Sequence, residues 1–453
     1  MAGTRGGTDA EPTTGAPAGG EATGLPARRA ALAALRQVEE DEAWSNQAVP
    51  RALRELPAAR DRGFAAHLAY ETLRWQGTLD RALALTCRRP LEQVEPALRR
   101  VLRLGATQLL ISDVPDRAAV ATSASLAREQ VPRRRADGAA GFVNGVLRGL
   151  ARRRHQLPWP SVEQDPVEHL ALTTGHPAWV VVDLLPRYGV ERTRRILAAD
   201  DVAPGLTLRA TGDRDALVAE LVAAGVDAVP GATPEAVRAP GTDPRELAAV
   251  REGRAVPQDE ASMRVAHATG AGAGTRALDL CAGPGGKATH LAALGATVTA
   301  VELHHHRAEL VRDAAAVQGV EVAVVVGDAR RAPLPADARF DVVLLDAPCT
   351  GLGTGRRRPE VRWRQTPDDA RSLAGLQAEL LTAAAGWVAP GGRLTYAVCT
   401  WTAAETVEVV DGAAGPLAAA GLEPEGTRQL LPDVDDTDGM FVASWSRSRA
   451  GDR

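Results

Sequence analysis

The sequence predicts a multidomain protein with an all-α helical bundle, a small α/β insert and a C-terminal α/β domain built on a parallel sheet. Apolar residues recur at helical spacing through most of residues 25–154. From residue 272 to the C-terminus, short apolar strands alternate with helical segments, and a glycine-rich turn joins the first strand to a helix. At 453 residues the chain is too long for one core, so two or three domains are expected.

Charge and cysteine content narrow the class of protein. The net charge is −4, yet residues 25–155 carry 23 Arg against 14 Asp and Glu. That local excess is typical of nucleic-acid binding, although a solvated helical surface explains it equally well. Four cysteines without a CxxC pair argue against a disulfide framework or a zinc site. Without a long apolar run or a signal peptide, we expect a cytoplasmic, monomeric protein with no membrane partner.

Composition and the positions of proline and glycine divide the chain into four parts. Residues 1–24 lack periodicity and read as a disordered tail. Residues 25–155 are expected to form the helical bundle, with about six helices. Residues 156–256 mix short strands with Pro/Gly turns and are expected to form a small α/β RNA-binding or linker domain. Residues 257–453 are expected to form the C-terminal α/β domain, to which we assign catalysis on the motifs described below.

The last part has the pattern of a doubly wound, Rossmann-like sheet with helices on both faces. The longest helical segment spans residues 367–388. The triplet at residues 304–306 is all histidine, but successive residues at a helix start face different directions, so no metal is expected. The predicted strands are residues 277–280, 297–301, 322–326, 342–345 and 394–398.

Acidic residues stand at the carboxyl ends of several of these strands. Open α/β sheets bind ligands at those ends. Glu302 follows Gly283 by 19 residues and is placed to accept hydrogen bonds from ribose hydroxyls. Asp328 could accept from an adenine amino group, and Asp346 ends the fourth strand. The turn lacks the spacing of a dinucleotide loop and the ending of a phosphate-binding loop. S-adenosylmethionine (SAM), which has no phosphate and needs carboxylates and backbone groups, fits better.

The reactive groups are one lysine and two thiols. Lys287 is the only lysine in the chain, which suggests a role that needs a compact ammonium group. Cys349 and Cys399 each follow an apolar strand, so adjacent strands would bring both thiols beside the cofactor. A thiolate that adds to C6 of cytosine makes C5 nucleophilic, and a second group must then help to remove the C5 proton. Asp346 can supply or relay a proton at N3 and can pair with Lys287.

Two stretches resemble known families. Residues 60–64, 72–74, 79–80, 102–109 and 141–148 together resemble the NusB-type RNA-binding helical domain, which implies RNA contact through basic helices. Residues 133–135 and 152–154, all arginine, are plausible phosphate contacts. The segments at residues 279–287, 346–353, 362–363 and 396–399, with residues 258–262, resemble the RNA cytosine-5 methyltransferases of the RsmB/NSUN (NOP2/Sun) superfamily, most closely its RsmB/Sun family.

The resemblance implies a class I SAM-dependent methyltransferase that modifies small-subunit (16S) ribosomal RNA, free or in an assembly intermediate. It implies that Cys399 is the nucleophile and that Cys349 assists product release. The same chemistry on tRNA and a non-catalytic RNA-binding assembly or antitermination factor are the alternatives. The cofactor-binding residues are expected to be Cys281, Ala282, Gly283, Pro284, Gly285, Gly286, Lys287, Glu302, Arg307, Asp328 and Asp346.

The chain departs from the family pattern at a few positions beside these groups. Val398 stands where the family usually has threonine before the nucleophile, which removes a hydroxyl expected near the thiol. The remaining departures are Ala288, Glu302, Thr400 and the pair Glu405-Thr406. Because both cysteines, Asp346 and Lys287 are intact, we expect activity.

Overall fold

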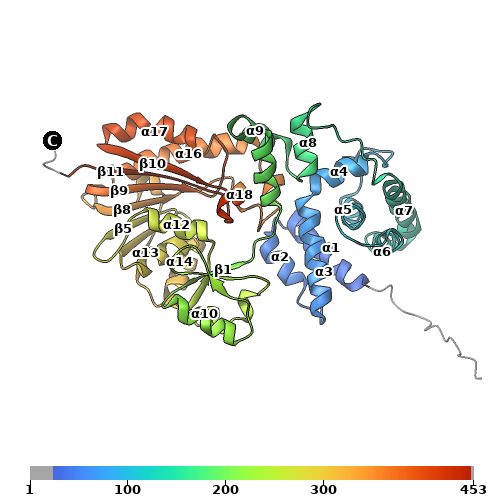
Figure 1. The fold of residues 1–453 in the computed structure, drawn as a ribbon, viewed down its shortest axis with the longest axis horizontal. Helices are drawn as coiled ribbons and strands as arrows, with labels where there is room; N and C mark the ends of the chain where they lie inside the picture. Colours follow the sequence, from blue (N-terminus) through green and yellow to red (C-terminus); the bar gives the residue numbers. More distant parts are fainter. Residues whose placement is uncertain (1–23, 450–453) are drawn as a thin grey trace, which may run out of the picture. The chain divides into compact units, whose positions relative to one another are not determined.

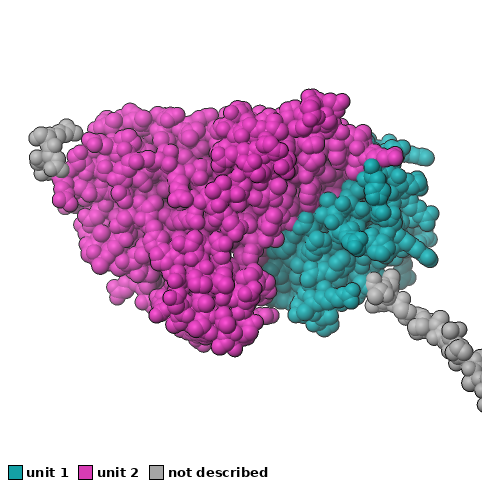
Figure 2. All heavy atoms as spheres, viewed as in Figure 1, with its two compact units in different colours: residues 1–43, 47–71, 83–155 teal, residues 44–46, 72–82, 156–453 magenta. Residues whose placement is uncertain are grey.

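The computed structural model describes residues 24–449, which form two compact units (Figure 2). The first unit comprises residues 47–71 and 83–155 with the described part of residues 1–43. The second comprises residues 44–46, 72–82 and 156–449. Apart from Gly24, the predicted N-terminal tail lies outside the described residues. Within residues 24–449, no helix is both long and apolar enough to cross a membrane.

The N-terminal part is the predicted all-α bundle (Figure 1). Leu98, Val101 and Leu102 recur at helical spacing and are buried along one face of α5. At Gly105 a β-carbon would lie 2.4 Å from a Leu147 methyl of α7, so a larger residue here would force the Leu147 side chain to move. The helices are α1 (Leu25–Glu40), α2 (Ser45–Ala52), α3 (Ala59–Arg74), α4 (Gln76–Ala84), α5 (Pro96–Leu110), α6 (Asp116–Glu129) and α7 (Ala136–Arg153).

A small antiparallel sheet follows two helices in the second unit. Its strand order is β2-β3-β1-β4, and Leu208 and Val237 pair across it in a buried apolar cluster. Asp213 caps the N-terminus of α10 by accepting hydrogen bonds from the backbone N–H groups of residues 215 and 216. The elements are α8 (Pro166–Thr173), α9 (Ala178–Asp200), β1 (Leu206–Ala210), α10 (Arg214–Ala223), β2 (Val229–Pro230), β3 (Ala236–Ala239), α11 (Ala248–Arg251) and β4 (Ala255–Pro257).

A seven-stranded mixed sheet forms the C-terminal domain, with strand order β10-β11-β9-β8-β5-β6-β7. The five predicted strands are the parallel ones, and each predicted stretch lies within its observed strand. The strands are β5 (Arg276–Leu280), β6 (Thr297–Glu302), β7 (Val322–Val326), β8 (Phe340–Asp346), β9 (Val388–Val398), β10 (Leu422–Leu430) and β11 (Met440–Arg447).

The expectation of a purely parallel sheet was wrong at one edge, where β11 pairs antiparallel with β9 and β10 pairs antiparallel with β11. Strand β10 reads Leu-Glu-Pro-Glu-Gly-Thr-Arg-Gln-Leu, and most of its side chains are exposed. An exposed edge strand with proline and glycine lacks the apolar pattern that identifies strands in a sequence.

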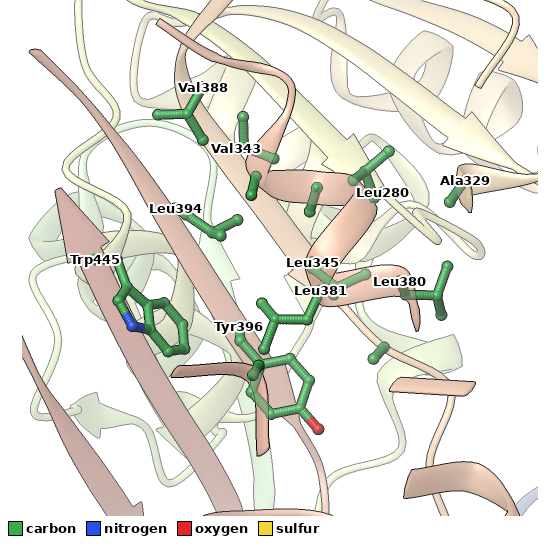
Figure 3. Packing of buried hydrophobic residues seen from close by; sticks show 14 of the residues in the cluster. Leu280, Ala329, Val343, Leu345, Leu380, Leu381, Val388, Leu394, Tyr396 and Trp445 are labelled. Carbon is green, nitrogen blue, oxygen red and sulfur yellow. The ribbon is translucent and has the colours of Figure 1, made fainter. Parts of the chain in front are cut away.

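Helices cover both faces of this sheet (Figure 1). On one face α16 and α17 enclose an apolar core to which Leu345, Leu381 and Tyr396 contribute (Figure 3). On the other face, α12, α13 and α14 pack against the sheet. Thr366 and Asp369 form a capping box at the start of α16, which fixes its first turn. The helices are α12 (Glu260–Ala268), α13 (Gly286–Ala293), α14 (His305–Gln318), α15 (Val361–Arg364), α16 (Pro367–Ala385), α17 (Val407–Ala419) and α18 (Pro432–Asp435).

Candidate active site

The strand order gathers the predicted site residues at one edge of the sheet. Parallel strands β9, β8, β5, β6 and β7 are consecutive neighbours, so their carboxyl ends lie side by side. The segments after these ends carry Cys399, Asp346, the glycine-rich turn, Glu302 and Asp328. Such an edge is the usual ligand-binding position of an open α/β sheet.

The glycine-rich turn is held by the end of the neighbouring strand. The Gly283 N–H donates to Glu302 Oε2 at 2.9 Å, and the Ala282 N–H donates to the Val301 carbonyl at 3.0 Å. A β-carbon on Gly283 would lie 2.5 Å from that carboxylate oxygen, so this close approach requires glycine. Arg307, from α14, donates to the Gly283 carbonyl. The first turn of α13 therefore begins from a fixed loop.

The chemistry of these groups fits SAM. Gly285 caps α13 in the left-handed region, with φ of 107°, and no side chain caps the helix. Backbone N–H groups at this helix start can therefore meet a ligand. Glu302 is buried beneath the turn, whereas Asp328 is more open and is bridged to Arg330. Loop amides and strand-end carboxylates suit a ligand with hydroxyl, amino and carboxylate groups and no phosphate.

Asp279, within strand β5, is a site residue that the sequence reasoning missed. It is fully buried, and neither of its carboxylate oxygens has a hydrogen-bond partner among the described residues. Burial, followed by the nearby Asp346 carboxylate, raises the pKa of Asp279 well above its usual value. A neutral carboxyl below the loop can donate a hydrogen bond. Its signals in the sequence were its position one residue before the end of an apolar strand and its place at the start of the family-like segment 279–287.

Lys287 and Asp346 form an ion pair between α13 and the end of β8. The Lys287 Nζ lies 2.7 Å from Asp346 Oδ2, and the lysine side chain is 12% exposed. Burial acts to lower the pKa of Lys287, but the Asp346 carboxylate outweighs burial and raises it. Lys287 is therefore held as a cation at the edge where Cys399 lies. The predicted pairing of these two residues is present in the structure.

The two predicted thiols face each other. Cys349 Sγ lies 3.4 Å from Cys399 Sγ, and both side chains are half-buried. Strands β8 and β9 are adjacent and parallel, with Asp346 in register with Ala397, which places the following turns together. Cys349 and Cys399 are about fifty positions apart in the sequence, and the pairing of their two strands is enough to bring them into contact.

The surroundings of the two thiols differ in charge. A hydrogen bond from Cys349 lowers the pKa of Cys399. Burial and the Asp346 carboxylate oppose this effect, and the Lys287 ammonium supports it. The hydrogen bond shared with Cys399, together with burial and the Glu405 carboxylate, raises the pKa of Cys349 well above its usual value. Because the shared hydrogen bond lowers the pKa of Cys399 and raises that of Cys349, the charge resides on Cys399 when one thiol ionises.

Glu405 links the two thiol-bearing turns, and this arrangement was not predicted. It is fully buried and accepts from the Thr350 N–H at 2.7 Å, the Thr350 hydroxyl at 2.6 Å and the Thr402 hydroxyl at 2.8 Å. Thr350 follows Cys349 and Thr400 follows Cys399, and their hydroxyl oxygens lie 2.9 Å apart. The sequence marked Glu405 only as part of a departure from the family pattern.

The expected loss of a hydroxyl beside the thiol at Val398 is not what the structure shows. Val398 is fully buried in the apolar cluster under α16 and α17, with Tyr396 and Phe441. Cys399 packs against the cluster on the opposite face of the sheet. Successive residues of a strand point to opposite faces, so a residue directly before the thiol faces away from it. Valine suits this apolar environment.

The fold and this edge define the chain as a class I SAM-dependent methyltransferase. The family model "16S rRNA methyltransferase RsmB/F" matches residues 271–446, and the NusB family model matches residues 25–152. The chain belongs to the RsmB/Sun family of SAM-dependent ribosomal RNA methyltransferases.

Relatives align along nearly the whole chain. A Mycobacterium tuberculosis protein named only as a methyltransferase is 41% identical, over 93% of this chain and 96% of its own. Ribosomal RNA small subunit methyltransferase B of Pseudomonas putida is 33% identical, over 92% and 97%.

Two solved structures share the fold. The crystal structure of PH0851 has a TM-score of 0.80 at 24% identity and covers 93% of this chain and 99% of its own. NSun6 from Pyrococcus horikoshii, solved with SFG, has a TM-score of 0.52 at 20% identity, over 59% and 97%.

Proposed function

We propose that the protein methylates C5 of a cytosine in 16S ribosomal RNA through a covalent adduct between Cys399 and C6 of the base. The observation that carries this proposal is the pair of thiols 3.4 Å apart at neighbouring strand ends, one beside a lysine and the other beside a carboxylate. A methyltransferase acting on an oxygen or an exocyclic nitrogen has no need of two facing thiols, whereas C5 of cytosine needs a nucleophile at C6.

The residues suit the two halves of this reaction. The cofactor, when bound, supplies an electrophilic methyl group. The Cys399 thiolate forms a bond to C6, a proton is delivered to N3, and the electron pair of the C5–C6 double bond becomes available at C5. Asp346, paired with Lys287, is placed to relay the proton to N3. After C5 is methylated, the C5 proton and the proton at N3 are removed, the C5–C6 double bond returns and Cys399 leaves as a thiolate.

Cys349 is the proposed base for that last step. While Cys399 is a thiolate, the shared hydrogen bond keeps the proton on Cys349. Once Cys399 is bonded to carbon, the negative charge beside Cys349 disappears and its thiol can ionise more readily. The closeness of the two thiols therefore keeps Cys349 protonated in the free protein and lets Cys349 serve as a base after the adduct forms. Glu405 is proposed as a positioning residue for both turns.

The RNA and the cofactor are proposed from the family and the site together. The SAM site comprises residues 281–287 with Glu302, Arg307, Asp328 and Asp346, and the N-terminal bundle is proposed to hold the RNA. Ribosomal RNA is favoured over tRNA because relatives that align over almost the full chain are named as ribosomal RNA small subunit methyltransferases.

The test is transfer of a labelled methyl group from SAM to unmodified 16S rRNA, followed by digestion to nucleosides. We expect label in 5-methylcytidine from one position of the RNA. Label in another nucleoside contradicts the chemistry, and label in tRNA but not in 16S rRNA contradicts the substrate. SAM binding with no transfer to either RNA contradicts the enzymatic role.

A further inference from the structure

A second cluster of polar groups lies apart from the thiols, between the small sheet and the methyltransferase sheet. Glu235 occupies the turn just before β3, His267 lies near the end of α12, and His290 lies on α13. All three belong to the second unit. They are far apart in the sequence, which is why no motif there pointed to them.

Their donor atoms converge. The His267 Nε2 lies 3.0 Å from Glu235 Oε1, and the His290 Nε2 lies 3.0 Å from the same oxygen. One ligand atom from each residue falls within 4.8 Å of the other two. The two imidazole rings meet edge to face, with centroids 5.4 Å apart and an angle of 87° between their planes. Two ligands bonded tetrahedrally at about 2.0–2.1 Å lie about 3.3 Å apart, so these separations suit a common ion.

His290 supplies an independent observation. Its side chain is 2% exposed, and neither ring nitrogen has a hydrogen-bond partner among the described residues. Its Nε2 lies 3.0 Å from Glu235 Oε1 but is not aligned for a hydrogen bond. A buried imidazole nitrogen that makes no hydrogen bond costs free energy. The His290 nitrogen lies near the carboxylate oxygen but does not point at it. This arrangement is expected when the nitrogen and the oxygen both point at a shared metal ion.

We propose that Glu235, His267 and His290 bind one divalent transition-metal ion of the Zn²⁺ class. Two imidazoles and one carboxylate form a ligand set that Zn²⁺ uses with water in a fourth position. Hard ions such as Mg²⁺ and Ca²⁺ prefer oxygen ligands and are poor occupants here. The buried Arg209 guanidinium also lies near this cluster and donates to Gln258, Thr289 and Gln318. Its positive charge opposes a bound cation, and the Glu235 carboxylate offsets that charge.

The fourth position has access to solvent. His267 lines a groove of about 730 Å³, together with Thr233 from the same turn as Glu235, Arg264 from α12 and Arg428 from β10. The side chain of His267 is 35% exposed. Water or a small anion could therefore complete the coordination from the groove.

The consequence is a link between three elements. A bound ion would fix the turn before β3 to α12 and to α13, the helix that begins at the glycine-rich turn and carries Lys287. The ion would stabilise the junction between the small sheet and the methyltransferase sheet, and it would take no part in methyl transfer.

The experiment uses the full chain, without a histidine tag, stripped with a chelator and titrated with Zn²⁺ and with Co²⁺. We expect one Zn²⁺ per chain and a Co²⁺ visible spectrum typical of tetrahedral nitrogen and oxygen ligands, without a sulfur charge-transfer band. His267→Asn should weaken binding at least about tenfold. His267 is partly exposed, so this variant should fold, and thermal melting checks that it does.

His306→Asn is the matched control, because His306 is exposed within the histidine triplet on another helix. This variant should bind Zn²⁺ with the affinity of the wild type. Absence of Zn²⁺ binding, or equal affinity in wild type and His267→Asn, would overturn the site and leave a metal-free ion cluster. A sulfur charge-transfer band would show that a cysteine binds the ion and would also overturn the proposed site. Methyl transfer is not the readout, so the result is independent of the proposed function.

Discussion

Cys349 Sγ and Cys399 Sγ lie 3.4 Å apart, on the turns that follow two adjacent parallel strands. The two thiols are chemically alike, but the Lys287–Asp346 ion pair lies beside Cys399, whereas the Glu405 carboxylate lies beside Cys349. This asymmetry turns a symmetric pair into a nucleophile and a partner, and it makes their roles testable.

The first prediction concerns the ionisation of Cys399. Because the Cys349 hydrogen bond and Lys287 lower its pKa, Cys399 should be alkylated by iodoacetamide with a midpoint below that of an ordinary thiol, about pH 8.5. Cys349→Ala removes the hydrogen bond, so the midpoint should move to higher pH. Cys349→Ser keeps a donor and should move it less. Peptide mapping by mass spectrometry after timed alkylation measures each site, and an unchanged midpoint in Cys349→Ala would contradict this electrostatic arrangement.

Cys281 serves as an internal comparison in the same experiment. Burial, followed by the neighbouring carboxylates, raises the pKa of Cys281 to about 12. Its thiol should therefore stay protonated and largely unmodified across the pH range in which Cys399 reacts. Rapid alkylation of Cys281 would show that the loop is open in solution.

The second prediction concerns Lys287→Arg. The ammonium lies 2.7 Å from Asp346 in a mostly buried position, and a planar guanidinium is larger and donates in other directions. Turnover should fall at least about tenfold, because misplacement of a catalytic group by a fraction of an ångström has effects of this size. Single-turnover methyl transfer and SAM affinity are measured together. Near-normal turnover would show that only the positive charge matters.

The third prediction concerns Glu405→Gln. Glu405 Oε1 accepts from both the Thr350 N–H and the Gln377 amide, and an amide in its place cannot serve every donor that the carboxylate serves. The turns should shift and the rate of adduct formation should fall about 10- to 100-fold, while RNA affinity stays the same. Glu408→Gln, at an exposed position of α17, is the control and should change neither. Equal loss of RNA affinity in Glu405→Gln would indicate a general structural defect.

The fourth prediction concerns a basic groove of the first unit. Arg88, Arg89, Arg152 and Arg153 line a groove of about 830 Å³, with Phe142 beneath Arg89. Of the other arginines expected to contact phosphates, Arg135 is paired with Glu95 and Arg154 with Asp116. The groove arginines are therefore better candidates than Arg135 and Arg154.

Arg89→Gln and Arg152→Gln should each weaken RNA binding and reduce its salt dependence. Each lost phosphate contact lowers the slope of log affinity against log salt by about 0.7 to 0.9. Arg135→Gln, whose guanidinium is already paired, is the control. Filter binding of 16S rRNA fragments across a salt series measures the slopes, and equal slopes in all variants would exclude this groove as an RNA contact.

The sequence predicts much of this architecture because its strands are short and strongly apolar. The strand that ends at Asp346 and the strand that ends at Val398 stand out by composition, and their parallel pairing places Cys349 and Cys399 at one edge. The exposed β10 does not stand out, since its pairing with β11 depends on backbone hydrogen bonds that leave little apolar pattern.

The unpredicted site features are those that depend on three-dimensional contacts. Asp279 acquires its raised pKa from burial and from Asp346, which lies on the neighbouring strand. Glu405 acquires its role from the turns that it links. Adjacency in the sequence suggests that the Val398 side chain lies beside the Cys399 thiol. Side chains alternate along a strand, however, so Val398 points to the opposite face of the sheet.

Trapping of the protein–RNA adduct tests the central proposal most directly. Cys349→Ala and Cys399→Ala are each incubated with SAM and unmodified 16S rRNA and resolved under denaturing conditions. We predict that Cys349→Ala accumulates a covalent complex because release is impaired, and that Cys399→Ala forms neither complex nor product. A complex in Cys399→Ala, with none in Cys349→Ala, would contradict the assignment and exchange the roles of the two thiols.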